Sequence, residues 1–300
     1  MSQTKKRVMI TGANSYIGVS FDTWAKNHYA NELSVDTVDM IDGSWRETDF
    51  SKYNCIFHVA GIAHADVGNV SVERKLFYYQ INRDLAIETA KKAKREGVKQ
   101  FVFMSSAIIY GESAPYGKQK MITAETEPAP ANFYGDSKWQ ADKGVRALQD
   151  DNFNVAVLRP PMIYGKGSKG NYPTLAKMAK KLPVFPNVNN ERSMLYIDNL
   201  TEFLCQLMLR GYAGIYFPQN AEYTKTADMV REIANVSSHK IWITKMFNWA
   251  VVLASHIPGK ISGLANKAFG NMTYEQNMSR YDFKYQIMDL RQSIERTEAE

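Results

Sequence analysis

The first half of the chain alternates between short apolar runs and longer stretches in which apolar side chains recur at helical spacing. The apolar runs predict buried strands at 8–10, 34–38, 54–60, 100–104 and 154–158. Large side chains from Ile17 to His28 repeat on one helical face and predict a helix after the first strand. Further helices are predicted at 73–95 and 133–148. Strands and helices in turn are typical of an α/β fold with a Rossmann-type, doubly wound parallel sheet.

The pattern changes at two places. About fifteen residues separate the second and third predicted strands, too few for a full crossover helix with its loops. After Pro160 the alternation loosens, with shorter helices predicted at 173–182 and 198–209 and a strand at 214–218 that returns to the sheet. We therefore expect a dinucleotide-binding domain over 1–165, completed by 214–218, and a smaller C-terminal substrate-binding lobe over 166–300.

Composition is that of a globular protein. Hydrophobic residues make up 45% of the 300 residues and charged residues 23%, which excludes a disordered, collagenous or coiled-coil chain. The net charge of +6 suggests an anionic partner without naming it. Lysine clusters at 91–95 and 177–181 are expected to be solvated helix faces. Because no aromatic interleaving or nucleic-acid motif accompanies them, we expect no nucleic-acid partner.

Three features bear on location. Two cysteines, Cys55 and Cys205, cannot form a disulfide framework, so a cytoplasmic location is expected. The first ten residues carry basic side chains but no long apolar run, so no secretory signal is expected. The aromatic and apolar stretch 241–257 is too short to span a bilayer. We expect it to pack against the C-terminal lobe; the alternative is peripheral contact with a membrane.

A glycine-bearing turn follows the first predicted strand. Its sequence is Thr11-Gly12-Ala13-Asn14-Ser15-Tyr16-Ile17-Gly18. Between a strand and a helix, main-chain N–H groups and the helix dipole can hold a pyrophosphate. Ser15 stands where a dinucleotide-binding motif has its middle glycine.

Two further groups of residues suggest acid–base chemistry. Tyr134 and Lys138 are four residues apart on a predicted helix and so share a face. A neighbouring ammonium favours the phenolate and would lower the pKa of Tyr134 towards a useful range. Ser105 and Ser106 follow the fourth strand, at the sheet edge where doubly wound folds bind ligands. A hydroxyl at that edge can donate a hydrogen bond to a substrate carbonyl.

No metal site is expected. His58 and His64 are close in sequence, but no cysteine or carboxylate completes a ligand set.

These motifs, together with Phe57-His58-Val59-Ala60-Gly61 and the blocks at 158–165 and 192–200, resemble the extended short-chain dehydrogenase/reductase family, which includes sugar-nucleotide epimerases, dehydratases and reductases. The resemblance covers nearly the whole chain. It implies catalytic roles for Tyr134 as acid–base, Lys138 as its partner and ribose ligand, and Ser106 as donor to the substrate carbonyl. It further implies a set of cofactor-contacting residues: Gly12, Asn14, Ser15, Tyr16, Ile17, Gly18, Ala60, Gly61, Tyr134 and Lys138. Asn171 and Arg192 hold the positions that contact the nucleotide diphosphate in relatives.

The residues after Ser106 reduce the number of reactions that the chain could catalyse. Family members that eliminate water carry an Asp-Glu pair there, whereas this chain has Ala107 and Ile108, which cannot transfer protons. The stretch 159–193 resembles reductases that convert a UDP-2-acetamido-2,6-dideoxy-hexos-4-ulose to UDP-N-acetylfucosamine or UDP-N-acetylquinovosamine in capsule and O-antigen synthesis. We therefore expect a UDP-sugar 4-ketoreductase. A UDP-hexose 4-epimerase with bound NAD and a non-catalytic nucleotide-sensing protein are the alternatives.

Cofactor choice depends on the end of the second predicted strand. Asp39 lies where an acidic side chain accepts hydrogen bonds from the ribose 2′-hydroxyl and repels a 2′-phosphate. NAD(H) is therefore favoured and NADP(H) remains an alternative. Asp36 and Asp42 compete for the same role. The family resemblance also implies a homodimer paired through the helices at 73–95 and 133–148.

Overall fold

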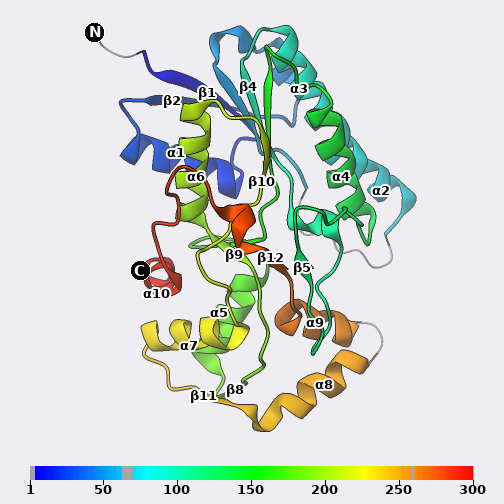
Figure 1. Ribbon diagram of the computed structural model, residues 1–300, viewed down its shortest axis with the longest axis vertical. Helices are drawn as coiled ribbons and strands as arrows, with labels where there is room; N and C mark the ends of the chain where they lie inside the picture. Colours follow the sequence, from blue (N-terminus) through cyan, green and yellow to red (C-terminus); the bar gives the residue numbers. More distant parts are fainter. Residues whose placement is uncertain (1–3, 63–69, 258–259, 300) are drawn as a thin grey trace.

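A parallel sheet forms one end of the molecule (Figure 1). The computed structural model describes residues 4–62, 70–257 and 260–299. Within these ranges six strands pair in the order β10-β6-β4-β3-β1-β2, all of them parallel. Their bounds are Lys6–Thr11 for β1, Leu33–Val38 for β2, Cys55–His58 for β3, Gln100–Met104 for β4, Asn154–Leu158 for β6 and Gly214–Tyr216 for β10. The predicted Rossmann-type sheet is confirmed, including the returning strand.

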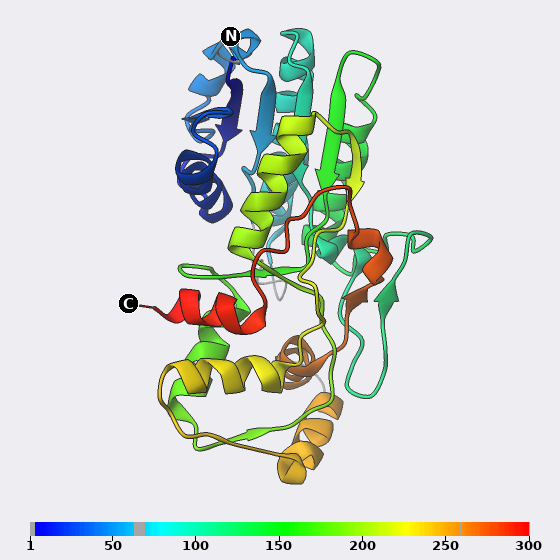
Figure 2. The same ribbon diagram turned by 60° about the vertical axis from the view of Figure 1, so that its left-hand side comes forward.

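Alternate residues of each strand face two different helix layers. On β1, Val8 and Ile10 pack in one core with α1 (Tyr16–His28) and α6 (Ile197–Arg210). Met9, between them, packs in a second core with α3 (Leu85–Arg95) and α4 (Phe133–Arg146). Because strand side chains alternate between faces, the two cores lie on opposite sides of the sheet. Figures 1 and 2 show the two helix layers on either side.

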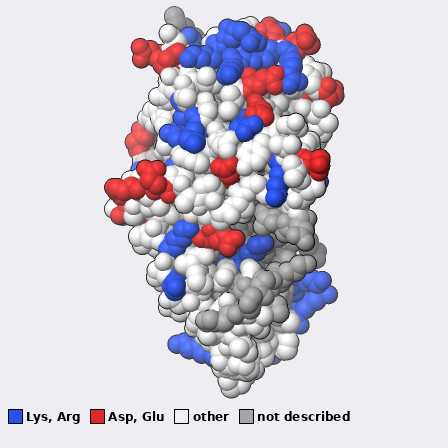
Figure 3. Space-filling model, turned by 90° about the vertical axis from the view of Figure 1, so that its right-hand side faces the viewer, with Lys and Arg blue, Asp and Glu red and all other residues white. Residues whose placement is uncertain are grey.

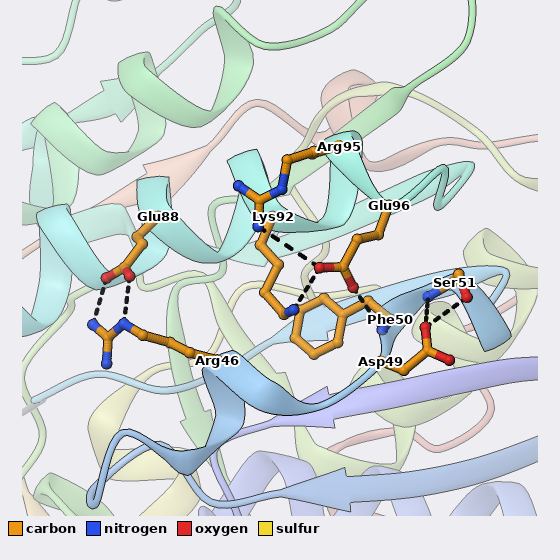
Figure 4. A network of polar contacts seen from close by, with 8 residues as sticks. All are labelled: Arg46, Asp49, Phe50, Ser51, Glu88, Lys92, Arg95 and Glu96. Carbon is orange, nitrogen blue, oxygen red and sulfur yellow. Dashed lines mark hydrogen bonds and ion pairs between the residues drawn. The ribbon is translucent and has the colours of Figure 1, made fainter.

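The short connection between β2 and β3 holds no full helix, as its length predicts. It forms two single-turn 3₁₀ helices, Ser44–Glu47 and Phe50–Lys52. Side chains from α3 and from the residue after it fix this segment (Figure 4): Glu88 binds Arg46 at 2.5 Å, and Glu96 accepts a hydrogen bond from the Phe50 N–H at 2.8 Å. Lys92, expected on a solvated face, is instead buried and pairs with Glu96, because the 3₁₀ segment covers it.

The helical stretch predicted at 73–95 contains a change of helix type. Residues Val72–Tyr79 form α2, Gln80–Asp84 form a π-helical turn, and α3 follows directly. A π turn inserts one extra residue and rotates the side chains that precede it relative to those that follow. Asn82 lies within this π turn, between α2 and α3, and its side chain is buried.

The remaining elements build the second lobe and interleave with the first part. The helices are α5 (Asn171–Lys181), α7 (Thr226–Val236), α8 (Asn248–His256), α9 (Lys260–Phe269) and α10 (Leu290–Glu298). Short parallel pairs join β5 (Met121–Ile122) to β12 (Thr273–Tyr274), β7 (Met162–Tyr164) to β9 (Met194–Tyr196), and β8 (Val184–Pro186) to β11 (Trp242–Thr244). Because α6 and β10 lie with the sheet, the chain passes between the two parts more than once (Figure 2).

The expectation that residues 241–257 pack against the lobe is wrong for most of their large side chains. Val251 is buried, but Trp242, Trp249 and Leu253 are more than half exposed. The sequence shows that these residues are apolar. Only the packing of the lobe shows which face of the segment is covered. Within the described ranges, no helix has the length and apolar character needed to cross a membrane.

Candidate active site

The turn after β1 passes very close to the end of β3. Gly12 has a φ of +116°, and a Cβ built there would lie 2.8 Å from the main-chain nitrogen of Ala60. No side chain fits that gap, and few residues other than glycine adopt that φ. The two main chains therefore form a shallow cradle directly before the N-terminus of α1, at the predicted cofactor turn.

Ser15 caps α1. Its hydroxyl accepts a hydrogen bond from the Gly18 N–H at 3.2 Å, and a Cβ at Gly18 would lie 2.6 Å from that hydroxyl. The departure from the glycine motif thus supplies a helix cap, while Gly18 keeps the space that the cap needs. The first turn of α1 contains no acidic residue, so the partial positive charge of the helix end is not cancelled locally. The cradle and the capped helix end fit a dinucleotide pyrophosphate.

The structure separates the three candidate acids near β2. Val38 accepts hydrogen bonds from the N–H groups of Gly12 and Ala13, so Asp39, the next residue, lies beside the turn. Asp39 is exposed and accepts a hydrogen bond from the Ile41 N–H at 2.8 Å. Asp36 lies within β2, paired with Arg7 at 3.3 Å, and Asp42 accepts hydrogen bonds from Ser44. Of the three, Asp39 is the one that directly follows the residue hydrogen-bonded to the turn.

Behind the cradle, the chain after β3 meets α4 and the π turn. A Cβ at Gly61 would lie 3.0 Å from Asn82 Oδ1 and 3.1 Å from Lys138 Nζ. Asn82 accepts a hydrogen bond from the Ile62 N–H at 2.8 Å and donates one to Ser137 Oγ at 3.1 Å. It therefore fixes the Gly61 segment against α4. Sequence reasoning missed Asn82, because a lone asparagine inside a helical pattern gives no sign of a π turn.

Lys138 is buried at the centre of this arrangement. Its Nζ donates a hydrogen bond to the Met104 carbonyl at 3.2 Å and lies 5.4 Å from the centre of the Phe103 ring. Burial lowers the pKa of Lys138 to about 8, because the ammonium has lost most of its water. The hydrogen bond joins α4 to the strand end that precedes Ser106.

Tyr134 is half-buried one helical turn before Lys138. Its ring meets that of Tyr78 edge-on, with centroids 6.2 Å apart. Burial, followed by the effect of Tyr78, raises the pKa of Tyr134 to about 12. The expected lowering by Lys138 is therefore absent from this structure, in which the ammonium is bound to Met104 and burial dominates. Around neutral pH, Tyr134 carries a proton that it can donate.

The two serines after β4 point to different surroundings. Ser105 is buried, and its hydroxyl has no hydrogen-bond partner among the described residues. Ser106 is less buried and caps the 3₁₀ helix Ala107–Tyr110, accepting a hydrogen bond from the Ile108 N–H at 3.3 Å. Of the pair, Ser106 is the one with access to a ligand at this edge of the sheet.

A cavity of about 40 Å³ begins at Ala107, the residue after Ser106. Arg192 belongs to its wall and donates hydrogen bonds through Nη1 to the carbonyls of Lys267, at 2.7 Å, and Gly270. Burial lowers the pKa of Arg192. The lining is mostly apolar: Ala107, Ile122, Pro161, Met162, Arg192, Ser193, Met272, Thr273 and Tyr274.

The structure therefore places Arg192 in the wall of the cavity that begins after Ser106. Asn171 is not part of that wall. Asn171 begins α5 and is exposed.

His58 has a structural environment. Its Nδ1 lies 2.8 Å from Thr11 Oγ1, and its ring stacks near those of Phe101 and Phe103. Burial, with a smaller effect of Lys138, lowers the pKa of His58 to about 3, so the ring is neutral. His64 lies outside the described residues. Among those residues, no group of three or more potential ligands could hold a metal ion.

Comparison with known proteins decides the family. The sequence pattern of the NAD dependent epimerase/dehydratase family matches residues 8–216. The chain belongs to this family.

Within this epimerase/dehydratase family, a UDP-glucose 4-epimerase from Vibrio cholerae is 28% identical over 287 residues, covering 89% of this chain and 86% of the relative. An Escherichia coli O157:H7 relative, N-acetyl-alpha-D-glucosaminyl-diphospho-ditrans,octacis-undecaprenol 4-epimerase, is 26% identical over 247 residues, covering 76% of this chain and 71% of the relative. The crystal structure of dTDP-4-dehydrorhamnose reductase from Bacillus anthracis in complex with NADP has the same fold, with a TM-score of 0.71, 19% identity and 98% coverage of both chains. Family and relatives support an NAD-dependent sugar-nucleotide enzyme of the epimerase/dehydratase type.

Proposed function

We propose that the protein reduces the C4 ketone of a UDP-4-keto-6-deoxy-N-acetylhexosamine, giving UDP-N-acetylfucosamine or UDP-N-acetylquinovosamine for surface polysaccharide synthesis. The observation that carries this proposal is the mostly apolar cavity that begins at Ala107, directly after Ser106, and the raised pKa of Tyr134 agrees with it. Reduction of a ketone needs a proton donor at the developing alkoxide, and a phenol whose pKa is about 12 holds its proton throughout the neutral range. A 4-epimerase must first remove the proton of the C4 hydroxyl, which needs the phenolate.

The small cavity beside Ser106 supports a 6-deoxy sugar. Its wall includes Ala107, Pro161 and Met162, and its volume is about 40 Å³. A methyl group is stabilised by such a wall, whereas a 6-hydroxyl group would lose its hydrogen bonds to water. Elimination of water is disfavoured, because Ala107 and Ile108 after Ser106 carry no acid–base group.

The residues of this chain then divide the work. The Gly12 turn and the Ser15-capped end of α1 would hold the dinucleotide pyrophosphate, together with Asn14, Tyr16, Ile17 and Gly18 of the same turn. Asp39 would accept hydrogen bonds from the adenosine ribose, and Ala60 and Gly61 would line the cofactor. The reduced nicotinamide supplies a hydride when bound.

Around the sugar, Ser106 would donate a hydrogen bond to the C4 carbonyl, and Tyr134 would give its proton to the oxygen as negative charge develops there. Lys138 would bind the nicotinamide ribose. It would also stabilise the phenolate that forms on Tyr134 when its proton has been given to the substrate. Arg192 would bind the UDP diphosphate, since both hydrogen bonds that its side chain makes to described residues use Nη1 and its fork has further donors. Asn171 is proposed to approach the same diphosphate from the start of α5.

A single assay tests the reaction. The purified protein is incubated with UDP-4-keto-6-deoxy-GlcNAc and either NADH or NADPH, and the product is identified by NMR. The proposal expects stoichiometric oxidation of the cofactor and a 4-hydroxy sugar. If neither cofactor is oxidised, the protein is not this reductase.

UDP-hexose 4-epimerisation is the second candidate, supported by the Vibrio cholerae relative along nearly the whole chain. This activity would interconvert UDP-GlcNAc and UDP-GalNAc, or UDP-glucose and UDP-galactose, with no net consumption of cofactor. Incubation with each UDP-hexose and NAD, followed by NMR, separates it from reduction.

A Tyr134→Phe variant tests whether the protein is a catalyst or a nucleotide sensor. Phenylalanine keeps the ring against Tyr78 and removes only the proton donor. We expect unchanged nucleotide binding and a rate lower by about two orders of magnitude or more. An unchanged rate would exclude the proposed role of Tyr134.

We also propose a homodimer paired through the helices expected at 73–95 and 133–148, which are α2 with α3, and α4. On α2, Val72, Leu76 and Phe77 are 67%, 55% and 46% exposed, an apolar surface that a second copy would cover. Light scattering of the purified protein measures the mass directly.

A further inference from the structure

The tip of the smaller lobe exposes a cluster of large apolar side chains. Of the sixteen large apolar side chains that are exposed among the described residues, six lie between residues 242 and 257, so they are a patch and not scattered. They are Trp242, Met246, Phe247, Trp249, Leu253 and Ile257, which are between 39% and 65% exposed. We call them the tip patch. Figures 1 and 2 show α8 at the end of the molecule farthest from the central sheet.

The tip patch follows helical geometry. Met246, Trp249, Leu253 and Ile257 are spaced by three, four and four residues, so they share one face of α8 and the turns that flank it. Val251 lies on another face and is buried in the lobe. The face of α8 that points away from the protein is therefore apolar, the reverse of an ordinary surface helix.

Charge around the tip patch has one sign. From 233 to 274 the sequence contains no Asp or Glu, whereas it contains Lys240, Lys245, Lys260 and Lys267. Lys240 and Lys245 flank Trp242, and both are exposed. At the lower end of the molecule the charged side chains in sight are basic (Figure 3).

We propose that the tip patch docks on an anionic lipid bilayer, with α8 lying in the plane of the interface. Exposed tryptophans suit the boundary between headgroups and acyl chains, because the indole has an apolar body and a polar N–H. Apolar side chains on one helix face, with lysines beside them, are the pattern of helices that bind anionic membranes from the surface. α8 has nine residues, enough to lie at the interface and too few to cross it.

A second copy of the chain fits the tip patch less well. A two-fold pairing of the patch with itself would bring Lys240 and Lys245 against the same lysines of the partner, with no carboxylate from 233–274 to neutralise them. A bilayer containing acidic phospholipids provides both the apolar layer and the negative charge.

Vesicle co-sedimentation of the full chain tests the proposal. Vesicles of phosphatidylcholine alone are compared with vesicles that also contain phosphatidylglycerol. We expect binding at least about tenfold stronger to the anionic vesicles, and weaker binding as salt is raised. A Trp249→Gln/Leu253→Gln variant should bind at least about tenfold more weakly, because it removes two apolar side chains from the interface. A Lys240→Gln/Lys245→Gln variant should lose most of the preference for anionic lipid.

The matched control is Val19→Gln, which replaces a side chain that is 53% exposed on α1, a helix beside the central sheet and at the opposite end of the molecule from α8 (Figure 1). It should bind vesicles like the unmodified protein. Circular dichroism and activity on soluble substrate show that each variant is folded. Absence of binding to anionic vesicles, or equal binding by the Trp249→Gln/Leu253→Gln variant, would overturn the proposal. A Trp249→Gln/Leu253→Gln variant that has a lower mass than the unmodified protein in light scattering, but binds vesicles equally well, would also overturn it. That result would assign the tip patch to an interface between protein chains.

Discussion

Lys138 Nζ donates a hydrogen bond to the main-chain carbonyl of Met104, 3.2 Å away, and so ties the helix that carries Tyr134 to the strand that leads to Ser106. The three residues with proposed catalytic roles are thereby mounted on two elements joined through a buried ammonium. The ammonium of Lys138 makes this link from the interior, where it has lost most of its hydration.

The first prediction concerns this lysine. Lys138→Met keeps the side-chain volume and removes the charge, so we expect the protein to stay folded while the reduction rate falls by about two orders of magnitude or more. Because the pKa of Lys138 is about 8, the rate of the unmodified protein should decline above that pH, as the charge that stabilises the Tyr134 phenolate is lost. Rates measured from pH 6 to pH 10 check both points.

Lys143→Met on the exposed side of the same helix is the matched control and should behave like the unmodified protein. Equal losses in the two variants, or an alkaline decline that persists in Lys138→Met, would contradict the role of Lys138.

Cofactor choice is predicted to depend on Asp39. In Asp39→Ala the hydrogen bonds to the ribose 2′-hydroxyl and the repulsion of a 2′-phosphate are both removed, so the ratio of kcat/KM for NADH over NADPH should fall by about tenfold. Steady-state kinetics with both cofactors measure this ratio. Asp36→Asn serves as the control, since Asp36 is already paired with Arg7 within β2. A ratio that moves in Asp36→Asn and not in Asp39→Ala would transfer the role to Asp36.

Acid stability should depend on His58. The pKa of His58 is about 3 in the folded chain and near 6.5 in an unfolded one, so the unfolded state binds more protons between these values. The contribution of the neutral His58 ring to the free energy of unfolding is complete above pH 6.5. It is lost as pH falls towards 3, at roughly 1.4 kcal/mol per pH unit. Urea unfolding at pH 7.5 and pH 5 should therefore show a smaller decrease for His58→Asn than for the unmodified protein. The exposed His28→Asn serves as control and should keep the full decrease.

A buried ion pair beside the site should matter for stability. Arg159 binds Asp142 through two hydrogen bonds of 2.9 Å, and both side chains are almost fully buried. Asp142 also binds Arg146, at 2.8 Å, so Asp142→Asn leaves two guanidinium groups without their shared counter-charge. We expect a loss of about 3–5 kcal/mol in the free energy of unfolding. Asp150→Asn breaks the half-exposed pair with Lys94 and should cost less than about 1 kcal/mol. If both variants lose a similar free energy of unfolding in urea, burial does not determine how much an ion pair contributes to stability.

The sequence by itself determined the strands of the central sheet, their alternation with helices, the turn at Gly12 and the shared face of Tyr134 and Lys138. These follow from local periodicity and from conformations that few residues adopt, which depend on neighbouring positions in the chain. The absence of a full helix between β2 and β3 also follows from chain length alone.

Only the tertiary structure decided which of these groups are buried and against what. The π turn at Asn82, the contact of Lys138 with Met104 and the upward shift of the Tyr134 pKa arise where segments distant in sequence meet and exclude water. The outward apolar face of α8 has the same origin. Periodicity shows which side chains share a face, but the loss of water that sets pKa values and exposure depends on what the rest of the chain places over that face.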